Sequence, residues 1–344
     1  MLDEVIKAFL PGVEEVLPEP IGSGLIHHTW KVEVGDDAYI LQEVNTSVFV
    51  RPEAIADNLD RIGRWLAERE PEYLFVAPKR TVGGGVFFSE AGALYRMFPF
   101  VAGSRTYDTV SSPEQAYEAA RQFGRFTRVL QGFDVGQLRE TLPHFHDLEL
   151  RYSQFVQAVE GGDARRVRES AALIGFLQGQ RGIVDRYLAL KRDPAFSLRV
   201  THHDTKISNV LFDGRNRGLC VIDLDTVMPG YFISDVGDMI RTYVSPANEE
   251  EVDLPRVAVR AEFYRAIQEG YMSEMGGVLS AAERECFYFS GLFMTYMQAL
   301  RFLADHLNRD VYYGARYEGH NYNRAANQVA LLRGLLDFQE RPRS

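Results

Sequence analysis

Residues 202–209 read HHDTKISN and residues 220–230 read CVIDLDTVMPG, and the order of these two stretches decides the fold. Two apolar runs lie between the motifs and are joined by residues 213–218, which read DGRNRG. Short apolar runs joined by glycine, asparagine and aspartate are typical of a β-hairpin. A hairpin returns the chain on itself, so we expect Asn209 and Asp223, at its two open ends, to lie close together.

The side chains around this hairpin suit phosphoryl transfer. That reaction needs positioning of the reactants, groups that hold a metal ion, and an acceptor for the hydroxyl proton of the substrate. Asp204 can accept the proton, and Lys206 can neutralise charge on the transferred phosphate. Asn209 and Asp223 offer the oxygen ligands that Mg²⁺ prefers. Such loop residues also satisfy backbone groups in many proteins, but the order of loop, hairpin and second acidic segment favours catalysis.

The first hundred residues have the pattern of a small sheet with one helix. Residues 30–34 and 39–44 are rich in β-branched and aromatic side chains and are joined by a Gly-Asp-Asp turn, which predicts a hairpin. Residues 52–70 carry apolar side chains at helical spacing, with a proline in the first turn. We expect a second hairpin that turns at residues 83–85, and a strand over residues 94–100.

The rest of the chain has helical periodicity. Residues 101–104 look like a connector, and helices are predicted to start at Ser112 and Ser280 because each serine is followed three residues later by Gln or Glu, as in a capping box. The predicted organisation is a small strand-rich lobe over residues 1–100, this connector, and a larger helical lobe over residues 105–344 that contains the catalytic hairpin.

The HxDxxxxN loop, the hairpin and the following IDxD segment resemble the aminoglycoside phosphotransferase and choline kinase group. The resemblance is closer to N-acetylhexosamine 1-kinases, whose metal-binding segment is similar to DLDTVMPG, and whose C-terminal helices are similar to residues 301–307 and 320–325. It covers nearly the whole chain. It implies an α+β, protein-kinase-like two-lobed fold with an antiparallel sheet in the small lobe.

The same resemblance implies a role for each residue around the hairpin. Asp204 would be the catalytic base, and Asn209 and Asp223 would hold Mg²⁺ beside the co-substrate ATP. Asp225 and Arg301 would contact the sugar. Two further residues are expected to be structural instead, namely Asp235, which matches an acidic position of the larger family, and His202, which we expect to pack and hydrogen-bond the loop.

A glycine-containing segment precedes the first predicted hairpin. Gly22, Ser23 and Gly24 could let backbone amides approach phosphate oxygens, with Thr29 nearby. A simple turn explains these residues equally well, but the position upstream of two strands favours contact with the nucleotide. His28 is a candidate for the sugar pocket.

The nucleotide side departs from the kinase-like pattern at one position. Where that pattern has a strand lysine that binds phosphates, this chain has Gln42, and Lys31 on the neighbouring strand is a possible substitute. Phe98 and Phe100 lie where the two predicted lobes connect, and we expect them near the adenine, although core packing explains them as well.

Composition excludes several classes of partner. There are 38 basic and 48 acidic residues, and the resulting formal charge of −10 argues against nucleic-acid and anionic membrane partners. Cys220 and Cys286 stand in apolar runs without metal-site spacing, so we expect buried thiols and a cytoplasmic location.

The function that these observations predict is ATP- and Mg²⁺-dependent phosphorylation of a sugar hydroxyl, the anomeric one if the acceptor is an N-acetylhexosamine. Choline, homoserine and aminoglycosides remain alternative acceptors. A nucleotide-binding pseudokinase is a further alternative, kept open by Gln42. The sequence gives no indication of the oligomeric state.

Overall fold

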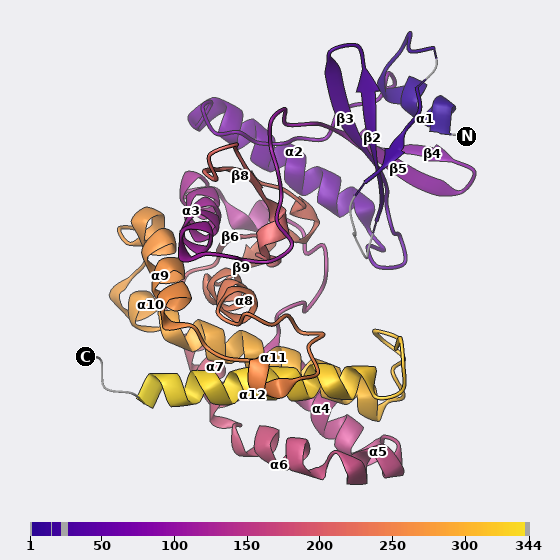
Figure 1. Cartoon of the computed structure of the whole chain (residues 1–344). Coiled ribbons are helices and arrows are strands. Elements are labelled where there is room, and N and C mark those ends of the chain that lie inside the picture. The colour runs from indigo at the N-terminus through magenta and orange to yellow at the C-terminus, as the bar shows by residue number, and fades with distance from the viewer. Residues whose placement is uncertain (1, 15, 22–26, 341–344) are drawn as a thin grey trace. The chain divides into compact units, whose positions relative to one another are not determined.

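The computed structural model describes residues 2–14, 16–21 and 27–340 (Figure 1). The chain forms two compact units. The first contains residues 1–105, 129–143 and 211–229, and the second contains residues 106–128, 144–210 and 230–344. The first unit thus includes the whole predicted small lobe together with two later segments. The lobe boundary at residues 101–104 remains a prediction.

A five-stranded antiparallel sheet is the centre of the first unit, as predicted for the small lobe. Its strand order is β1-β2-β3-β5-β4, and the strand bounds are β1 Glu19–Pro20, β2 His28–Val34, β3 Asp37–Glu43, β4 Phe88–Glu90 and β5 Ala93–Pro99. The predicted first hairpin is confirmed, because β2 pairs with β3 along its whole length. One face of the sheet buries Val32 and Leu41 against Val5 and Phe9 of helix α1 (Leu2–Phe9).

The second hairpin differs from the prediction. Residues 83–85 make a local turn, in which the Thr81 amide donates to the Gly85 carbonyl and the Gly85 amide donates to the Thr81 hydroxyl. The hairpin of paired strands turns later, between β4 and β5. Ala91 and Gly92 form that turn with φ of 50° and 84°, values that suit a primed hairpin turn. The run of three glycines is a strong local turn signal, whereas the strand pairing depends on which residues face each other across the sheet.

Helix α2 (Pro52–Arg69) confirms the predicted helix and its proline in the first turn. Its apolar stripe, Ile55, Leu59, Ile62 and Leu66, is buried. The catalytic hairpin is also confirmed: β7 (Val210–Phe212) pairs with β8 (Gly218–Val221), and Cys220 is buried as expected.

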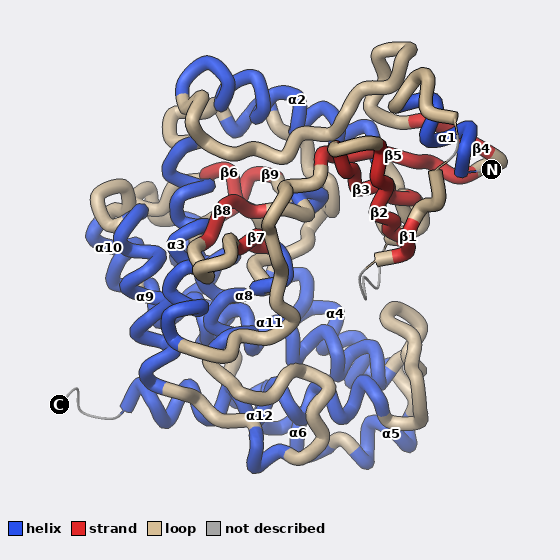
Figure 2. Tube along the Cα trace, turned by 45° about the horizontal axis from the view of Figure 1, so that its top comes forward, coloured by secondary structure: helices blue, strands red, loops and turns tan. Residues whose placement is uncertain are grey.

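The second unit is mostly helical (Figure 2). Its helices have these bounds: α3 Pro113–Val129, α4 Leu148–Gly161, α5 Ala164–Glu169, α6 Ala171–Gly179, α7 Gly182–Arg192, α8 Ile233–Tyr243, α9 Ala261–Met275, α10 Ala281–Glu285, α11 Phe287–Leu307 and α12 His320–Glu340. The remaining elements of the chain are short. Two strands are β6 Arg199–Thr201 and β9 Met228–Gly230, and the 3₁₀ turns are η1 Val135–Gln137 and η3 Leu224–Thr226 in the first unit, and η2 Ile207–Asn209 and η4 Leu254–Arg256 in the second.

Helix α11 is the buried centre of this unit and runs beside α12 (Figure 1). It also packs closely on α8, where a Cβ added at Gly237 would lie 2.4 Å from the carbonyl oxygen of Ser290. The apolar character of α11 therefore reflects burial within the protein. Across the residues described, no helix combines the length and the low charge needed to cross a membrane.

The two predicted helix starts are each confirmed in part. Ser112 accepts a hydrogen bond from the amide of Gln115, but the Gln115 side chain binds Ser111 instead of returning to Ser112. Ser280 and Glu283 form a complete capping box. That box starts the short helix α10, and the long apolar helix begins separately after Cys286.

Candidate active site

Two buried aspartates of α8 bind backbone amides of the catalytic loop. Asp235 accepts hydrogen bonds from the backbone amides of His202 and His203, at 3.0 and 2.7 Å, and Asp238 accepts one from the amide of Thr205 at 2.9 Å. His203 has a φ of 67°, so the backbone is in the left-handed region immediately before the predicted base. The loop backbone is thus held at three positions, 202, 203 and 205, which agrees with the structural role expected for Asp235.

Asp204 lies partly exposed between two of the residues predicted beside it. The side-chain Nδ2 of Asn209 donates to the carboxylate of Asp204 at 3.0 Å and to the backbone carbonyl of Asp204 at 2.9 Å. Lys206 makes an ion pair with the same carboxylate at 2.9 Å. Asn209 is buried, and the turn η2 that carries it is closed by its backbone bond to Lys206. The structure therefore brings three of the predicted site residues together: Asp204, Lys206 and Asn209.

His202 lies behind this group and is fully buried. Its ring meets Phe123 and Phe126 edge to face, with centroids 5.1 and 6.2 Å apart, and its Nδ1 accepts from the amide of Asp204 at 3.3 Å. These contacts match the packing role that the sequence indicated.

The pKa values of the two carboxylates that bind the loop, Asp235 and Asp238, are both raised. Burial raises the pKa of Asp235 to about 7, and the neighbouring charges of Asp238 and Asp204 act in the same direction, against the two backbone amides. Burial also raises the pKa of Asp238, although the guanidinium of Arg241 opposes this. The carboxylate of Asp238 forms an ion pair with the guanidinium of Arg241 at 2.9 Å. Of the two aspartates, only Asp238 has such a pair among the described residues.

The first unit contains the predicted metal segment. Asp223 is exposed, has a φ of 59°, and immediately precedes the turn η3. Its carboxylate, that of Asp225 and the ring of His27 offer ligand atoms that all lie within 4.8 Å of one another. An exposed carboxylate beside other oxygen and nitrogen donors fits a divalent cation. Asn209 belongs to the other unit, so its pairing with Asp223 at one ion remains a prediction.

Asp225 differs from Asp223 because it is 2% exposed and both of its oxygens are bound. Arg96 of β5 donates to them at 2.6 and 2.8 Å, and His27 lies 2.9 Å from one of them. Burial alone would raise the pKa of Asp225, but Arg96 and His27 outweigh it and lower the pKa to about 2. Contact between Asp225 and a sugar stays a prediction.

The predicted nucleotide residues fall into two groups. Gly22, Ser23 and Gly24 lie outside the described residues. Thr29 and Gln42 face each other across β2 and β3, with a long side-chain contact of 3.4 Å.

Two aromatic side chains predicted near the adenine are partly buried. Phe98 packs on Val76 and Cys220, and Phe100 lies under the ammonium group of Lys31 at 4.9 Å. Lys31 is also paired with Glu33 at 2.5 Å, and its side chain is partly buried. Its role as a substitute for the missing lysine stays a prediction. Adenine contact remains a prediction for both aromatic residues.

The sequence pointed to His28, but its neighbour has the more informative contacts. His28 is exposed at the start of β2 and packs on Trp30 with ring centroids 6.3 Å apart. His27 is the residue that reaches Asp225, and its ring stacks on Phe49. Sugar contact by His28 is untested by this geometry and stays a prediction.

Arg301 of α11 lies among aromatic rings in the second unit. Its guanidinium is 5.5 Å from the ring centroid of Phe145, 5.9 Å from that of Tyr312 and 5.5 Å from that of Tyr313. It donates to the side chain of Gln298 at 3.2 Å. Within the described part of the chain, no carboxylate forms an ion pair with it.

A pair of histidines connects this aromatic cluster with the catalytic loop. The Nδ1 atoms of His146 and His203 are 3.2 Å apart, and His203 directly precedes Asp204. Burial lowers the pKa of His146 well below its usual range, and the neighbouring His203 ring and the guanidinium groups of Arg301, Arg241 and Arg151 add to this. The neutral form of His146 is therefore favoured next to the catalytic loop.

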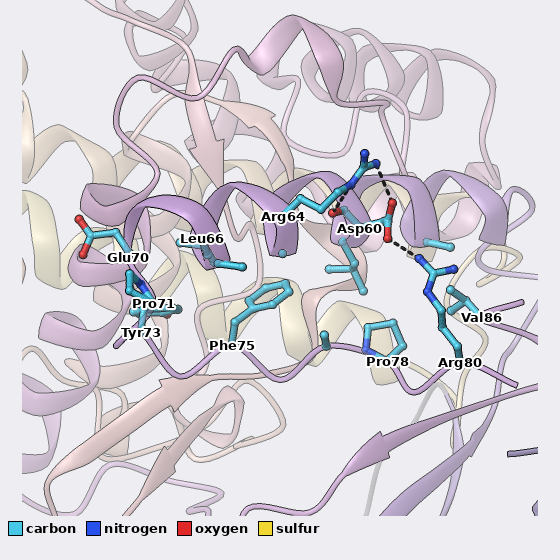
Figure 3. A pocket seen from close by; sticks show the side chains of 15 residues that line it. Asp60, Arg64, Leu66, Glu70, Pro71, Tyr73, Phe75, Pro78, Arg80 and Val86 are labelled. Carbon is cyan, nitrogen blue, oxygen red and sulfur yellow. Dashed lines mark hydrogen bonds and ion pairs between the residues drawn. The ribbon is translucent and has the colours of Figure 1, made fainter. Parts of the chain in front are cut away.

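A pocket of about 410 Å³ lies between α2 and the segment over residues 71–86 (Figure 3). Leu59, Leu66 and Phe75 line its apolar part, and the ion pairs of Asp60 with Arg64 and Arg80 lie at one end. None of the predicted site residues lines it.

Three solved structures have this fold. A microcompartment-associated aminopropanol kinase gives a TM-score of 0.65 at 17% identity, covering 98% of this chain and 96% of that one. A choline kinase from Cryptosporidium parvum gives 0.60 at 15%, covering 98% and 96%. A spectinomycin phosphotransferase in complex with ADP and spectinomycin gives 0.55 at 15%, covering 99% and 94%. The predicted α+β, kinase-like fold is confirmed.

The sequence itself also matches a family over more than half of its length. Residues 18–272 match the phosphotransferase enzyme family, abbreviated APH. This range includes the catalytic loop, the hairpin and both acidic segments. The chain therefore belongs to the phosphotransferase enzyme family, in the aminoglycoside phosphotransferase and choline kinase-like group that its motifs predicted.

Proposed function

We propose that this chain transfers the γ-phosphate of ATP, with Mg²⁺, to a hydroxyl of a neutral sugar, and that the acceptor is the anomeric hydroxyl of an N-acetylhexosamine. The observation that carries the proposal is the geometry of Asp204, whose carboxylate is held by Asn209 and Lys206 on a loop fixed by buried aspartates. The ADP-bound spectinomycin phosphotransferase supports ATP as the phosphate donor.

The chemistry is a single displacement. Asp204 takes the proton of the acceptor hydroxyl while the hydroxyl oxygen forms a bond to the γ-phosphorus, and the bond from that phosphorus to the leaving ADP oxygen breaks. A hemiacetal hydroxyl is more acidic than an ordinary alcohol, so a single carboxylate is a sufficient base. Lys206, whose ammonium group is 2.9 Å from the Asp204 carboxylate, would neutralise charge on the moving phosphoryl group.

Asp223 and Asn209 supply the oxygen atoms that would hold Mg²⁺, and they are hard ligands of the type that this ion takes. When bound, Mg²⁺ neutralises phosphate charge. In the Asn209 side chain, the two hydrogen bonds to Asp204 use the amide nitrogen, so they do not engage the amide oxygen that a metal would take.

Charge near the catalytic loop supports a neutral acceptor over a cationic one. Arg301 and Arg151 are both partly buried. Burial lowers the pKa of Arg151, and the positive charge of Arg301 lowers it further. A choline or aminoglycoside cation would meet the like charges of Arg301 and Arg151 there, and a desolvated like-charge contact is costly. The rings of Phe145, Tyr312 and Tyr313 beside Arg301 offer aromatic faces that suit a hydroxylated ring.

The test is a coupled assay of ADP release with N-acetylhexosamines, other hexoses, homoserine, choline and an aminoglycoside, each with Mg-ATP. We expect turnover with a neutral sugar, and the product's phosphate position can be read by NMR. The Asp204→Asn variant should lower kcat by about 10²–10⁴, the usual contribution of a positioned proton acceptor. Asp185→Asn, an exposed carboxylate on α7, is the matched control and should keep full turnover.

Near wild-type turnover in Asp204→Asn would reject Asp204 as the base. A cationic acceptor that outperforms every neutral sugar would reject the acceptor class. Binding of Mg-ATP without transfer to any acceptor would identify the chain as a pseudokinase.

A further inference from the structure

Arg96 and Gln42 are direct cross-strand partners in the sheet of the first unit. They face each other in the antiparallel pair of β3 and β5. The Nε and Nη2 atoms of Arg96 donate to the amide oxygen of Gln42 at 3.0 and 2.9 Å. Gln42 stands where the kinase-like pattern has a cationic lysine. In this chain the positive charge in this region is that of Arg96, on the neighbouring strand β5.

The rest of the Arg96 guanidinium is used within the protein. It binds both oxygens of Asp225, at 2.6 and 2.8 Å, and the Arg96 side chain is 2% exposed. A buried guanidinium needs such partners, because an unpaired buried charge is strongly destabilising. Each of the two acceptor groups, an amide and a carboxylate, takes two of its N–H donors, so Arg96 faces protein groups rather than solvent.

Fixing Asp225 also fixes the residue that is predicted to bind the metal. Asp223 lies two positions earlier, at the start of the same tight turn, which closes by a bond from the Val227 amide to the Leu224 carbonyl. The other end of the turn is held by Asn58 of α2, whose side chain donates to the carbonyl of Val227 at 3.0 Å. The turn is therefore attached to the sheet through Arg96 and to the helix through Asn58.

We propose that Arg96 is a positioning residue for the metal: through Asp225 it sets the place of Asp223, and it takes the structural part of the missing lysine's role without contacting phosphate. The proposal rests on the proposed function, because it takes Asp223 as a ligand of the nucleotide's Mg²⁺. Its consequence is that nucleotide affinity depends on the metal site, since the usual lysine charge is absent and the chain carries a net charge of −10.

The experiment measures ADP binding by calorimetry over a series of MgCl₂ concentrations and in EDTA, with no acceptor present. In Arg96→Met, the MgCl₂ concentration for half-maximal binding should rise by about tenfold or more, as when other supports of metal ligands are removed. Binding in EDTA should not change. Arg96→Lys should lie in between, because an ammonium group keeps the charge but cannot hold the amide and both carboxylate oxygens together.

The control is Arg166→Met on α5, which removes another partly buried ion pair, that with Asp310, away from both acidic motifs. It should lower the thermal midpoint in EDTA but leave the MgCl₂ dependence unchanged. If Arg96→Met alone does not fold, the double variant Arg96→Met/Asp225→Leu removes both charges, a change that buried pairs often tolerate. It should still show the raised MgCl₂ requirement.

A wild-type MgCl₂ dependence in the folded single or double variant would overturn the proposal. An equal loss of affinity in EDTA would also overturn it, because Arg96 would then act on the phosphates directly. The assay needs no acceptor, so a chain that shows the expected MgCl₂ shift but phosphorylates no substrate would reject the proposed function and leave the role of Arg96 supported.

Discussion

Two buried aspartates ten positions apart, Asp225 and Asp235, are held in opposite ways. Asp225, in the first unit, has a guanidinium on both oxygens, and its pKa falls to about 2 as the charge of Arg96 outweighs burial. Asp235, in the second unit, receives two backbone amides, and its pKa rises to about 7 because burial dominates. Burial alone therefore does not decide the charge of a carboxylate in this protein. The identity of the donor decides it.

This difference has a functional consequence for the two motifs. A charge pair can attach a turn across a sheet, as Arg96 does for the segment that carries Asp223. A carboxylate that binds consecutive amides instead fixes the backbone of one loop, as Asp235 does just before Asp204. We therefore expect that substitutions in the Arg96–Asp225 pair change metal binding. Substitutions of Asp235 should instead change the position of Asp204, the proposed base.

The largest effect on stability is expected from isosteric asparagine substitutions at these two positions. Asp225→Asn leaves Arg96 buried without a counter-charge, and breaking a buried pair in this way costs about 3–5 kcal/mol. Asp235→Asn keeps one acceptor oxygen, so one backbone amide loses its partner at a cost of about 1–3 kcal/mol. Urea unfolding of both variants and of the wild type measures the difference. Equal losses, or a larger loss for Asp235→Asn, would contradict the comparison.

The pH dependence should separate the two aspartates further. The folded pKa of Asp235 is raised to about 7, so the stability that it contributes is full below its unfolded pKa of about 3.9 and is lost as the pH rises through about 7. The folded pKa of Asp225 is lowered to about 2, so its contribution is present above about pH 4 and is lost as the pH falls toward 2.

The measurement is the free energy of unfolding from pH 5 to pH 8. The advantage of the wild type over Asp235→Asn should shrink across this range, by up to about 1.4 kcal/mol per pH unit. The advantage over Asp225→Asn should stay constant, which makes that variant the internal control. A constant difference for Asp235→Asn would show that its carboxylate is already ionised at pH 5.

The fold and the catalytic loop were predictable because their signals are local. The first hairpin, α2 and the catalytic hairpin each follow from periodicity and turn residues within a short window. The order of motifs around Asp204 identified Lys206 and Asn209 as candidate site residues, and their contacts with the Asp204 carboxylate were visible only in the structure. Where a local signal competed with strand pairing, at residues 83–85, the pairing decided the hairpin.

The contacts that fix the predicted metal-binding segment, from His27 and Arg96 to Asp225, were not predictable from local signals. His27 and Asp225 are separated by 198 positions, and no periodicity links them. One signal was present: Arg96 is the only charged residue in the strand ALYRMFP, and a charge inside an apolar strand indicates a buried ion pair. Its partner could be identified only from the folded chain.

An effect on stability no larger than that of Asp235→Asn is expected at Gly230, the last residue of the DLDTVMPG segment. A Cβ there would lie 2.5 Å from Cε1 of His203 and 2.8 Å from the hydroxyl of Thr201, so both side chains would have to move. Gly230→Ala should cost about 1–3 kcal/mol, as overpacking usually does. It should also lower kcat with an unchanged KM for ATP, because His203 directly precedes the base.

The matched substitution is Gly175→Ala in α6, where an added Cβ meets no atom within 4 Å. It should raise the free energy of unfolding by about 0.5–1 kcal/mol, since alanine is the better helix former, and leave kcat unchanged. Full activity in Gly230→Ala would show that His203 can shift without moving Asp204. The backbone bonds from Asp235 would then be sufficient on their own to place the base, which would strengthen the contrast between a backbone-held loop and a turn held by a charge pair.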